Sequence, residues 1–162
     1  MKIQDLAESY FDQTVAFRRF LHKNPELAFQ EVQTSAFIRT QLEESGYSVH
    51  TGFATTGLVG SFDTGKTGPR FLLRFDMDAL PVEEENDFGY QSLNPGKMHA
   101  CGHDGHIAIG LTIAWMIKQL QNELSGSFHL LFQPAEEIGQ GAETMIRDGV
   151  LDLIKPDYVV GA

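Results

Sequence analysis

The spacing of apolar residues along the chain predicts four helices. Apolar side chains recur at helical intervals from Ile3 to His22, and Asn24-Pro25 then ends the pattern. A second helical pattern stops before Gly46, a residue suited to a helix C-cap. A third pattern is so strongly apolar that it is typical of a core helix. We expect helices over residues 3–22, 31–45, 106–121 and 141–148.

Shorter apolar segments between these patterns predict strands. The nearly continuous apolar run from Arg70 to Phe75 indicates a strand that is buried on both faces. Strands that alternate with helices favour an α/β fold, so we expect a mostly parallel sheet flanked by helices. The predicted strands cover residues 48–53, 57–62, 70–75, 128–132 and 158–162.

One long segment, residues 79–105, has little periodicity and is rich in Gly, Pro and Asn. It is too long for an ordinary connection, and loops of this kind are often functional. Within it, the run Glu83-Glu84-Glu85 is expected to be a solvated group of surface charges. His22 lies at the end of the first predicted helix, where an imidazole is expected to have a structural use.

Polar residues gather where the predicted strands end, which is where open α/β sheets place functional groups. Asp76 and Asp78 follow one strand, and either could fix a histidine or contact a metal ion. Glu136 and Glu137 follow another strand, and adjacent residues point in different directions. One carboxylate can therefore bind a metal ion while the other faces a substrate and transfers protons.

The segment 98–106 is the sharpest chemical signal, because three of the six histidines and the only cysteine lie within it. Cys101 and His103 are two residues apart, so in an extended segment both side chains leave the same face. Thiolate and imidazole suit zinc, cobalt and similar ions. Asp104 could orient one of these ligands. A buried thiol among hydrogen-bonded histidines is the alternative interpretation of the same residues.

Composition narrows the function classes further. The net charge is −10, and no basic cluster is present, so nucleic acid and anionic membranes are poor partners. No apolar stretch approaches the ~20 residues that cross a bilayer, and residues 1–8 do not resemble a signal peptide. A single cysteine cannot form an internal disulfide. We expect one compact cytoplasmic domain.

Four ordered motifs resemble the amidohydrolases of the M20 metallopeptidase group. The resemblance is closest to the branch with hippurate hydrolase, bacterial N-acyl-amino-acid amidohydrolases, N-acetyl-diaminopimelate deacetylase and plant auxin-conjugate hydrolases. The motifs are specific for the family but not for the substrate. They are LHKNPELAFQE at residues 21–31, LRFDMDALP at 73–81, MHACGHDGH at 98–106 and FQPAEE at 132–137.

The resemblance implies that residues 1–162 are the N-terminal part of a zinc-exopeptidase-like catalytic domain. It makes Cys101, His103 and Glu137 metal ligands, Glu136 the general base and acid, and Asp78 a supporting carboxylate. It also implies two divalent ions in the parent enzyme, as zinc, manganese, cobalt or nickel, and a small N-acyl amino acid as substrate.

The resemblance also implies parts that this sequence does not contain. Family members carry an inserted lid domain that mediates dimers, and further histidine ligands beyond the strand that begins at Tyr158. We therefore expect a piece of a longer protein, with little activity and weak metal binding, or none, on its own. A truncated, non-catalytic metal-binding or interaction domain is the main alternative. Thiol redox chemistry at Cys101 is a weaker one, since no resolving cysteine exists.

Overall fold

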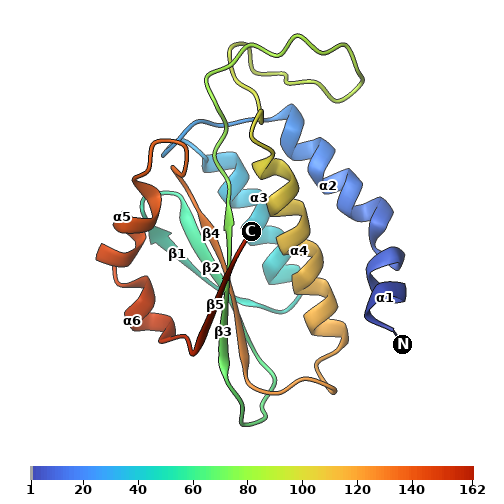
Figure 1. Ribbon diagram of the computed structural model, residues 1–162, viewed down its shortest axis with the longest axis vertical. Helices are drawn as coiled ribbons and strands as arrows, with labels where there is room; N and C mark the ends of the chain where they lie inside the picture. The colour runs from blue at the N-terminus through green and yellow to red at the C-terminus, as the bar shows by residue number, and fades with distance from the viewer. Residues whose placement is uncertain (1) are drawn as a thin grey trace.

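The computed structural model describes residues 2–162, which form one sheet with helices on both faces (Figure 1). Among these residues, no helix is long and apolar enough to cross a membrane. The helices are α1 (Ile3–Ser9), α2 (Phe11–Lys23), α3 (Val32–Glu44), α4 (His103–Gln119), α5 (Gly141–Arg147) and α6 (Val150–Ile154). The strands are β1 (Ser48–Phe53), β2 (Gly57–Asp63), β3 (Arg70–Asp76), β4 (Ser127–Gln133) and β5 (Tyr158–Gly161).

The five strands lie in the order β1-β2-β4-β3-β5. Strand β3 pairs in parallel with both β4 and β5, whereas β2 pairs antiparallel with both β1 and β4. Four strands therefore run in one direction and β2 runs against them. The expected α/β class is confirmed, with the correction that half of the strand pairs are antiparallel, because β1, β2 and β3 follow one another through short turns.

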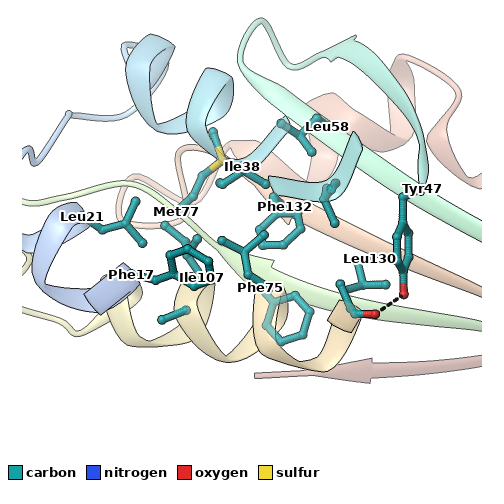
Figure 2. Packing of buried hydrophobic residues seen from close by; sticks show 14 of the residues in the cluster. Phe17, Leu21, Ile38, Tyr47, Leu58, Phe75, Met77, Ile107, Leu130 and Phe132 are labelled. Atoms are coloured by element: carbon teal, nitrogen blue, oxygen red, sulfur yellow. Dashed lines mark hydrogen bonds between the residues drawn. The ribbon is translucent and has the colours of Figure 1, made fainter. Parts of the chain in front are cut away.

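The strands β2, β3 and β4 send alternate side chains into two separate cores. Leu130 and Phe132 of β4 face the larger core under α2, α3 and α4, and Leu131 between them faces the smaller core under α5 and α6. Figure 2 shows Phe75 and Phe132 of the larger core packed against α4. Figure 1 shows the helices divided between the two faces in the same way.

Two glycines explain how α4 sits on the sheet and where it begins. Gly110 lies over the rings of Phe75 and Phe132, and a Cβ atom at Gly110 would meet Phe75 at 2.9 Å. At the other end, Gly102 has a φ of 102°, a left-handed conformation that glycine adopts readily. Gly102 is the N-cap of α4, so the helix begins at His103 and not at His106 as the apolar pattern predicted.

Two further features of the helices differ from the prediction: a break in the first helix and an additional short helix. The single helix expected over residues 3–22 is broken at Tyr10, whose N–H donates to Ala7 and closes α1 with a tighter turn. The ring of Tyr10 packs against Trp115 of α4, with 5.5 Å between ring centroids. Gly149 ends α5 as predicted, but its positive φ also begins α6, a helix that the pattern did not predict.

Candidate metal centre

The register of the central strands brings the two acidic clusters together. Strand β3 lies parallel to β4 with Asp76 opposite Gln133, so the residues after each strand leave the same edge of the sheet. The start of α4 reaches this edge as well, because the loop from Ala79 to Gly102 returns over it (Figure 1). The residues that the motifs singled out therefore lie together at this edge of the sheet.

One ligand atom each from Cys101, His103 and Glu137 lies within 4.8 Å of the other two. The spacing argument that predicted this approach was wrong in its mechanism. Cys101 lies in a bend and His103 is the first residue of α4, so the two do not share one face of an extended segment. The left-handed Gly102 between them turns the chain so that both side chains reach Glu137.

His103 is held with one ring nitrogen free for a ligand role. Its Nδ1 lies 2.9 Å from the backbone carbonyl of Asp78, which can only accept a hydrogen bond, so Nδ1 carries the proton. Its Nε2 lies 3.7 Å from Glu136 Oε2 and 3.8 Å from Glu137 Oε1. Histidine ligands commonly have this arrangement, with the second nitrogen fixed by an oxygen acceptor.

The carboxylates around His103 shift its protonation. Burial lowers the pKa of His103, but the contacts with Asp78 and the negative charge of Asp76 outweigh burial and leave the pKa above its ordinary value. A proton and a cation would therefore compete for the ring of His103.

The surroundings of Glu137 indicate whether the group of Cys101, His103 and Glu137 fits a metal ion. Its side chain is 17% exposed, and its Oε1 is buried without a hydrogen-bond partner in the described part of the chain. A buried carboxylate oxygen without a partner is unfavourable, and a cation beside it would remove the penalty. Thiolate, imidazole and carboxylate are the donors that zinc and similar ions take. The three residues thus fit a divalent ion.

Cys101 is an exposed thiol beside this carboxylate. Partial burial, the contact with Glu137 and the charges of Glu136 and Asp76 raise the pKa of the thiol. Reactive cysteines have lowered pKa values and lie among positive charges, so the surroundings of Cys101 do not favour a nucleophilic thiolate in the absence of a cation.

Asp78 shapes the turn that carries the two glutamates. Its two oxygens accept the backbone N–H groups of Glu136 and Glu137, each at 3.1 Å. Burial raises the pKa of Asp78, but His103 and these two N–H groups outweigh burial and leave it below its ordinary value. Both oxygens of Asp78 are therefore occupied, which matches the supporting role that the motif implied.

Asp76 takes the other role foreseen for this pair of acids, because it fixes a histidine. Its Oδ1 lies 2.6 Å from Nδ1 of His106, and its Oδ2 accepts a bond of 2.7 Å from Arg74. Asp76, His103 and His106 also bring ligand atoms within 4.8 Å. A contact of 2.6 Å between two of them is a hydrogen bond, however, so Asp76 and His106 are engaged with each other.

Two predictions about charged residues near the centre were wrong. Asp104 forms no direct hydrogen bond to Cys101, His103 or Glu137; its carboxylate lies 2.7 Å from His22 Nδ1 and accepts a bond from Arg18. Glu84 is not a solvated charge, because its side chain is only 3% exposed and contacts Nε2 of His22. His22 thus has the structural use expected of it, between two carboxylates.

No role was assigned from the sequence to two buried groups, His99 and Glu31, although both lie in the quoted motifs. Burial lowers the pKa of His99 to about 4, and neither of its ring nitrogens has a hydrogen-bond partner within residues 2–162. Glu31 is fully buried and accepts a hydrogen bond from the N–H of Ala135. The acceptor and donor are 104 residues apart, so no local pattern indicates this contact.

The comparison with protein families decides which group the chain belongs to. The model described as peptidase family M20/M25/M40 matches residues 72–162, more than half of the chain. The chain belongs to this family. The match includes all three residues of the candidate ligand group and Glu136.

Members of the M20 family with similar sequences are hydrolases by name. IAA-amino acid hydrolase ILR1-like 5 of Arabidopsis thaliana is 46% identical over 145 residues, which are 90% of this chain and 33% of the relative. The N-acyl-L-amino acid amidohydrolase of Geobacillus stearothermophilus is 40% identical over 161 residues, which are 99% of this chain and 43% of the relative.

A solved structure of the M20 family has the same fold. A dinuclear metal-binding peptidase of Bacillus subtilis superposes with a TM-score of 0.89 at 37% identity, over 95% of this chain and 43% of that one. The expectation of an M20 catalytic fold is therefore confirmed. The chain spans less than half of the length of each of these three relatives.

Proposed function

We propose that residues 1–162 are the N-terminal part of the catalytic domain of an enzyme that hydrolyses the amide bond of N-acyl amino acids with divalent metal ions. The observation that carries the proposal is the approach of Cys101, His103 and Glu137 to within 4.8 Å, with a partnerless buried oxygen on Glu137. The similarity to an N-acyl-L-amino acid amidohydrolase supports the substrate class.

In this proposal Cys101, His103 and Glu137 hold zinc, manganese, cobalt or nickel. A divalent ion there supplies positive charge that polarises an amide carbonyl and makes water more acidic. Three side chains are too few for two ions, since each usually takes four or more ligands. We therefore expect the parent protein to supply the remaining ligands, and the 162-residue chain to bind metal weakly and to have little or no activity.

Glu136 is the proposed proton carrier. Its side chain is 40% exposed, and its Oε2 lies 3.7 Å from Nε2 of His103, so it borders the ligand group without being enclosed by it. From there it accepts a proton from the attacking water and delivers the proton to the leaving amine nitrogen. Asp78 assists by fixing the backbone of both glutamates, which keeps Glu136 beside the reaction and Glu137 on the cation.

Titration of the chain with Co²⁺ tests the ligand group. We expect a thiolate-to-cobalt charge-transfer absorption in the wild type and its loss in Cys101→Ser. His50→Asn, outside the ligand group, is the matched control and should keep the absorption. A wild-type spectrum without this absorption, at saturating cobalt, would contradict the assignment of Cys101.

Hydrolysis is tested on the parent full-length protein with added Mn²⁺ or Co²⁺, using N-acetyl and N-benzoyl amino acids. Turnover of one or more of these substrates is expected. A parent protein that binds metal and turns over none of them would instead favour the alternative of a non-catalytic metal-binding or interaction domain. Dimerisation through a further domain and a cytoplasmic location stay predictions.

A further inference from the structure

We infer that Glu31 is a positioning residue for the metal centre, because it holds Ala135 in the conformation that directs Glu136 and Glu137 toward His103. The effect of Glu31 on catalysis rests on the proposed function. The structural part of the inference, that Glu31 sets the geometry of the turn, is independent of metal and substrate.

Ala135 has an unusual backbone conformation. Its φ is 53°, in the left-handed region that a residue with a Cβ atom rarely adopts. The residue is fully buried, and it immediately precedes the two glutamates. A strained residue of this kind persists only where its surroundings hold it in place.

The surroundings hold the turn with two buried carboxylates. Oε1 of Glu31 accepts the N–H of Ala135 at 3.0 Å, and the two oxygens of Asp78 accept the next two N–H groups. Three consecutive backbone donors are thus bound from two directions. The carbonyl of Ala135 accepts the N–H groups of Gln140 and Gly141, which together with Asp78 holds the peptide before Glu136. The bond to Glu31 holds the N–H on the other side of Ala135.

Glu31 is itself fixed in place. It is the residue before α3, it is fully buried, and its Oε2 accepts a bond of 2.6 Å from the hydroxyl of Thr56. Burial raises the pKa of Glu31, against which the hydrogen bonds to Thr56 and Ala135 act. Burying a carboxylate costs free energy. The presence of a buried carboxylate here indicates that its two acceptor oxygens have a specific use.

The decisive variants are Glu31→Ala, Glu31→Gln and the double variant Glu31→Ala/Ala135→Gly of the 162-residue chain. Glu31→Ala leaves the N–H of Ala135 buried without an acceptor, so the left-handed conformation of residue 135 loses one of the hydrogen bonds that hold it. We expect the affinity for Co²⁺ to fall about 10- to 100-fold, as for other residues that orient metal ligands. The amide NMR signals of Glu136 and Glu137 should shift in the metal-free chain.

The other two variants separate positioning from mere loss of stability. In Glu31→Gln the amide oxygen can accept the N–H of Ala135 and the amide nitrogen can donate to Thr56, so both readouts should stay close to wild type. Glycine adopts the left-handed region without strain. Ala135→Gly should therefore restore most of the cobalt affinity and the two amide signals in the Glu31→Ala background.

Ala54 offers a matched control within the same chain. It is also a buried alanine with positive φ, 46°, and its N–H donates to Asp148 at 2.7 Å. Asp148→Ala should lower stability and leave the cobalt spectrum and the signals of Glu136 and Glu137 unchanged. If Glu31→Ala does not fold, Glu31→Asp, which withdraws the carboxylate by one methylene, carries the same expectation.

Unchanged amide signals in Glu31→Ala, or no recovery in the double variant, would overturn the inference. So would equal effects of Glu31→Ala and Asp148→Ala on the cobalt spectrum. A wild type that binds no cobalt would count against the proposed function alone, since the amide signals of the metal-free chain still decide whether Glu31 sets the turn.

Discussion

Nδ1 of His22 lies 2.7 Å from Oδ2 of Asp104, and this contact joins the end of α2 to the start of α4. Both side chains are buried. Asp104 follows His103 directly, so the contact secures the helical turn that presents the imidazole to Glu137. Glu84 lies on the other nitrogen of His22 and connects the long loop to the same point.

Replacement of His22 by Leu should destabilise the chain strongly. The change removes the imidazole contact of the buried Asp104 carboxylate and leaves it an ion pair with Arg18, which is half exposed. Breaking a buried pair in this way lowers the free energy of unfolding by about 3–5 kcal/mol. Urea unfolding followed by circular dichroism measures the change.

Glu43→Ala is the control for His22, because Glu43 forms an exposed pair with Arg39 on α3. Such surface pairs contribute at most about 0.5 kcal/mol. Similar losses for the two variants would show that burial of Asp104 has no special weight.

Substitutions of Glu136 and of Glu137 should impair different properties of the parent full-length protein, namely kcat and metal affinity. Glu136→Gln removes the proposed proton carrier and should lower kcat about 100- to 10,000-fold with metal affinity retained. Glu137→Gln removes a charged ligand oxygen and should weaken metal binding. Calorimetric metal titration beside steady-state kinetics distinguishes the two losses. A Glu136→Gln variant with wild-type kcat would contradict the assignment of roles.

Gly110→Ala should destabilise the contact between α4 and the sheet. The added Cβ atom would meet the ring of Phe75 at 2.9 Å and that of Phe132 at 3.1 Å. Overpacking of this kind costs about 1–3 kcal/mol. Gly105→Ala, in the same helix with no atom within 4 Å of the new Cβ, should instead be neutral or stabilising by up to about 1 kcal/mol. Thermal unfolding of both variants provides the comparison.

His129 should make the stability of the chain depend on pH. Burial lowers the pKa of its imidazole, and the charges of His50 and Arg70 lower it further. The unfolded chain therefore binds the proton more readily than the native chain does. Stability from this group is complete above the ordinary pKa of about 6.5 and is lost as the pH falls toward the lowered folded value.

His129→Gln removes this titration and can keep the contacts with Ser61 and Ser127. Its free energy of unfolding should decrease less than that of the wild type between about pH 7.5 and about pH 5. Identical slopes for the two proteins would refute the lowered pKa.

Most of the fold could be predicted from local patterns. The apolar runs of β3 and β4 are recognisable because both faces of these strands are buried, and Gly46 marks the end of α3. The break at Tyr10 and the start of α4 at His103 were missed. The first depends on packing against Trp115, and the second on the left-handed Gly102, neither of which alters the apolar pattern.

The approach of Cys101, His103 and Glu137 could be predicted because such residues are rare and clustered, and because the motifs resemble those of the M20 family. The residues that arrange the group could not. Glu31 and Ala135 meet across 104 residues, and His22 and Glu84 across 62. Contacts over such distances follow from the sheet order and the path of the long loop, which the spacing of residues does not reveal.

Phe75 and Phe132 belong to the larger core, and the residue after Phe75, Asp76, already contacts His106 beside the candidate metal centre. A displacement of β3 along β4 by a single position would expose one ring and misalign the acidic side chains at the same time. Folding correctly and assembling the proposed ligand group therefore depend on the same strand register in this chain. Variants selected for correct folding will tend to keep the arrangement of these side chains, and variants selected for that arrangement will tend to fold correctly.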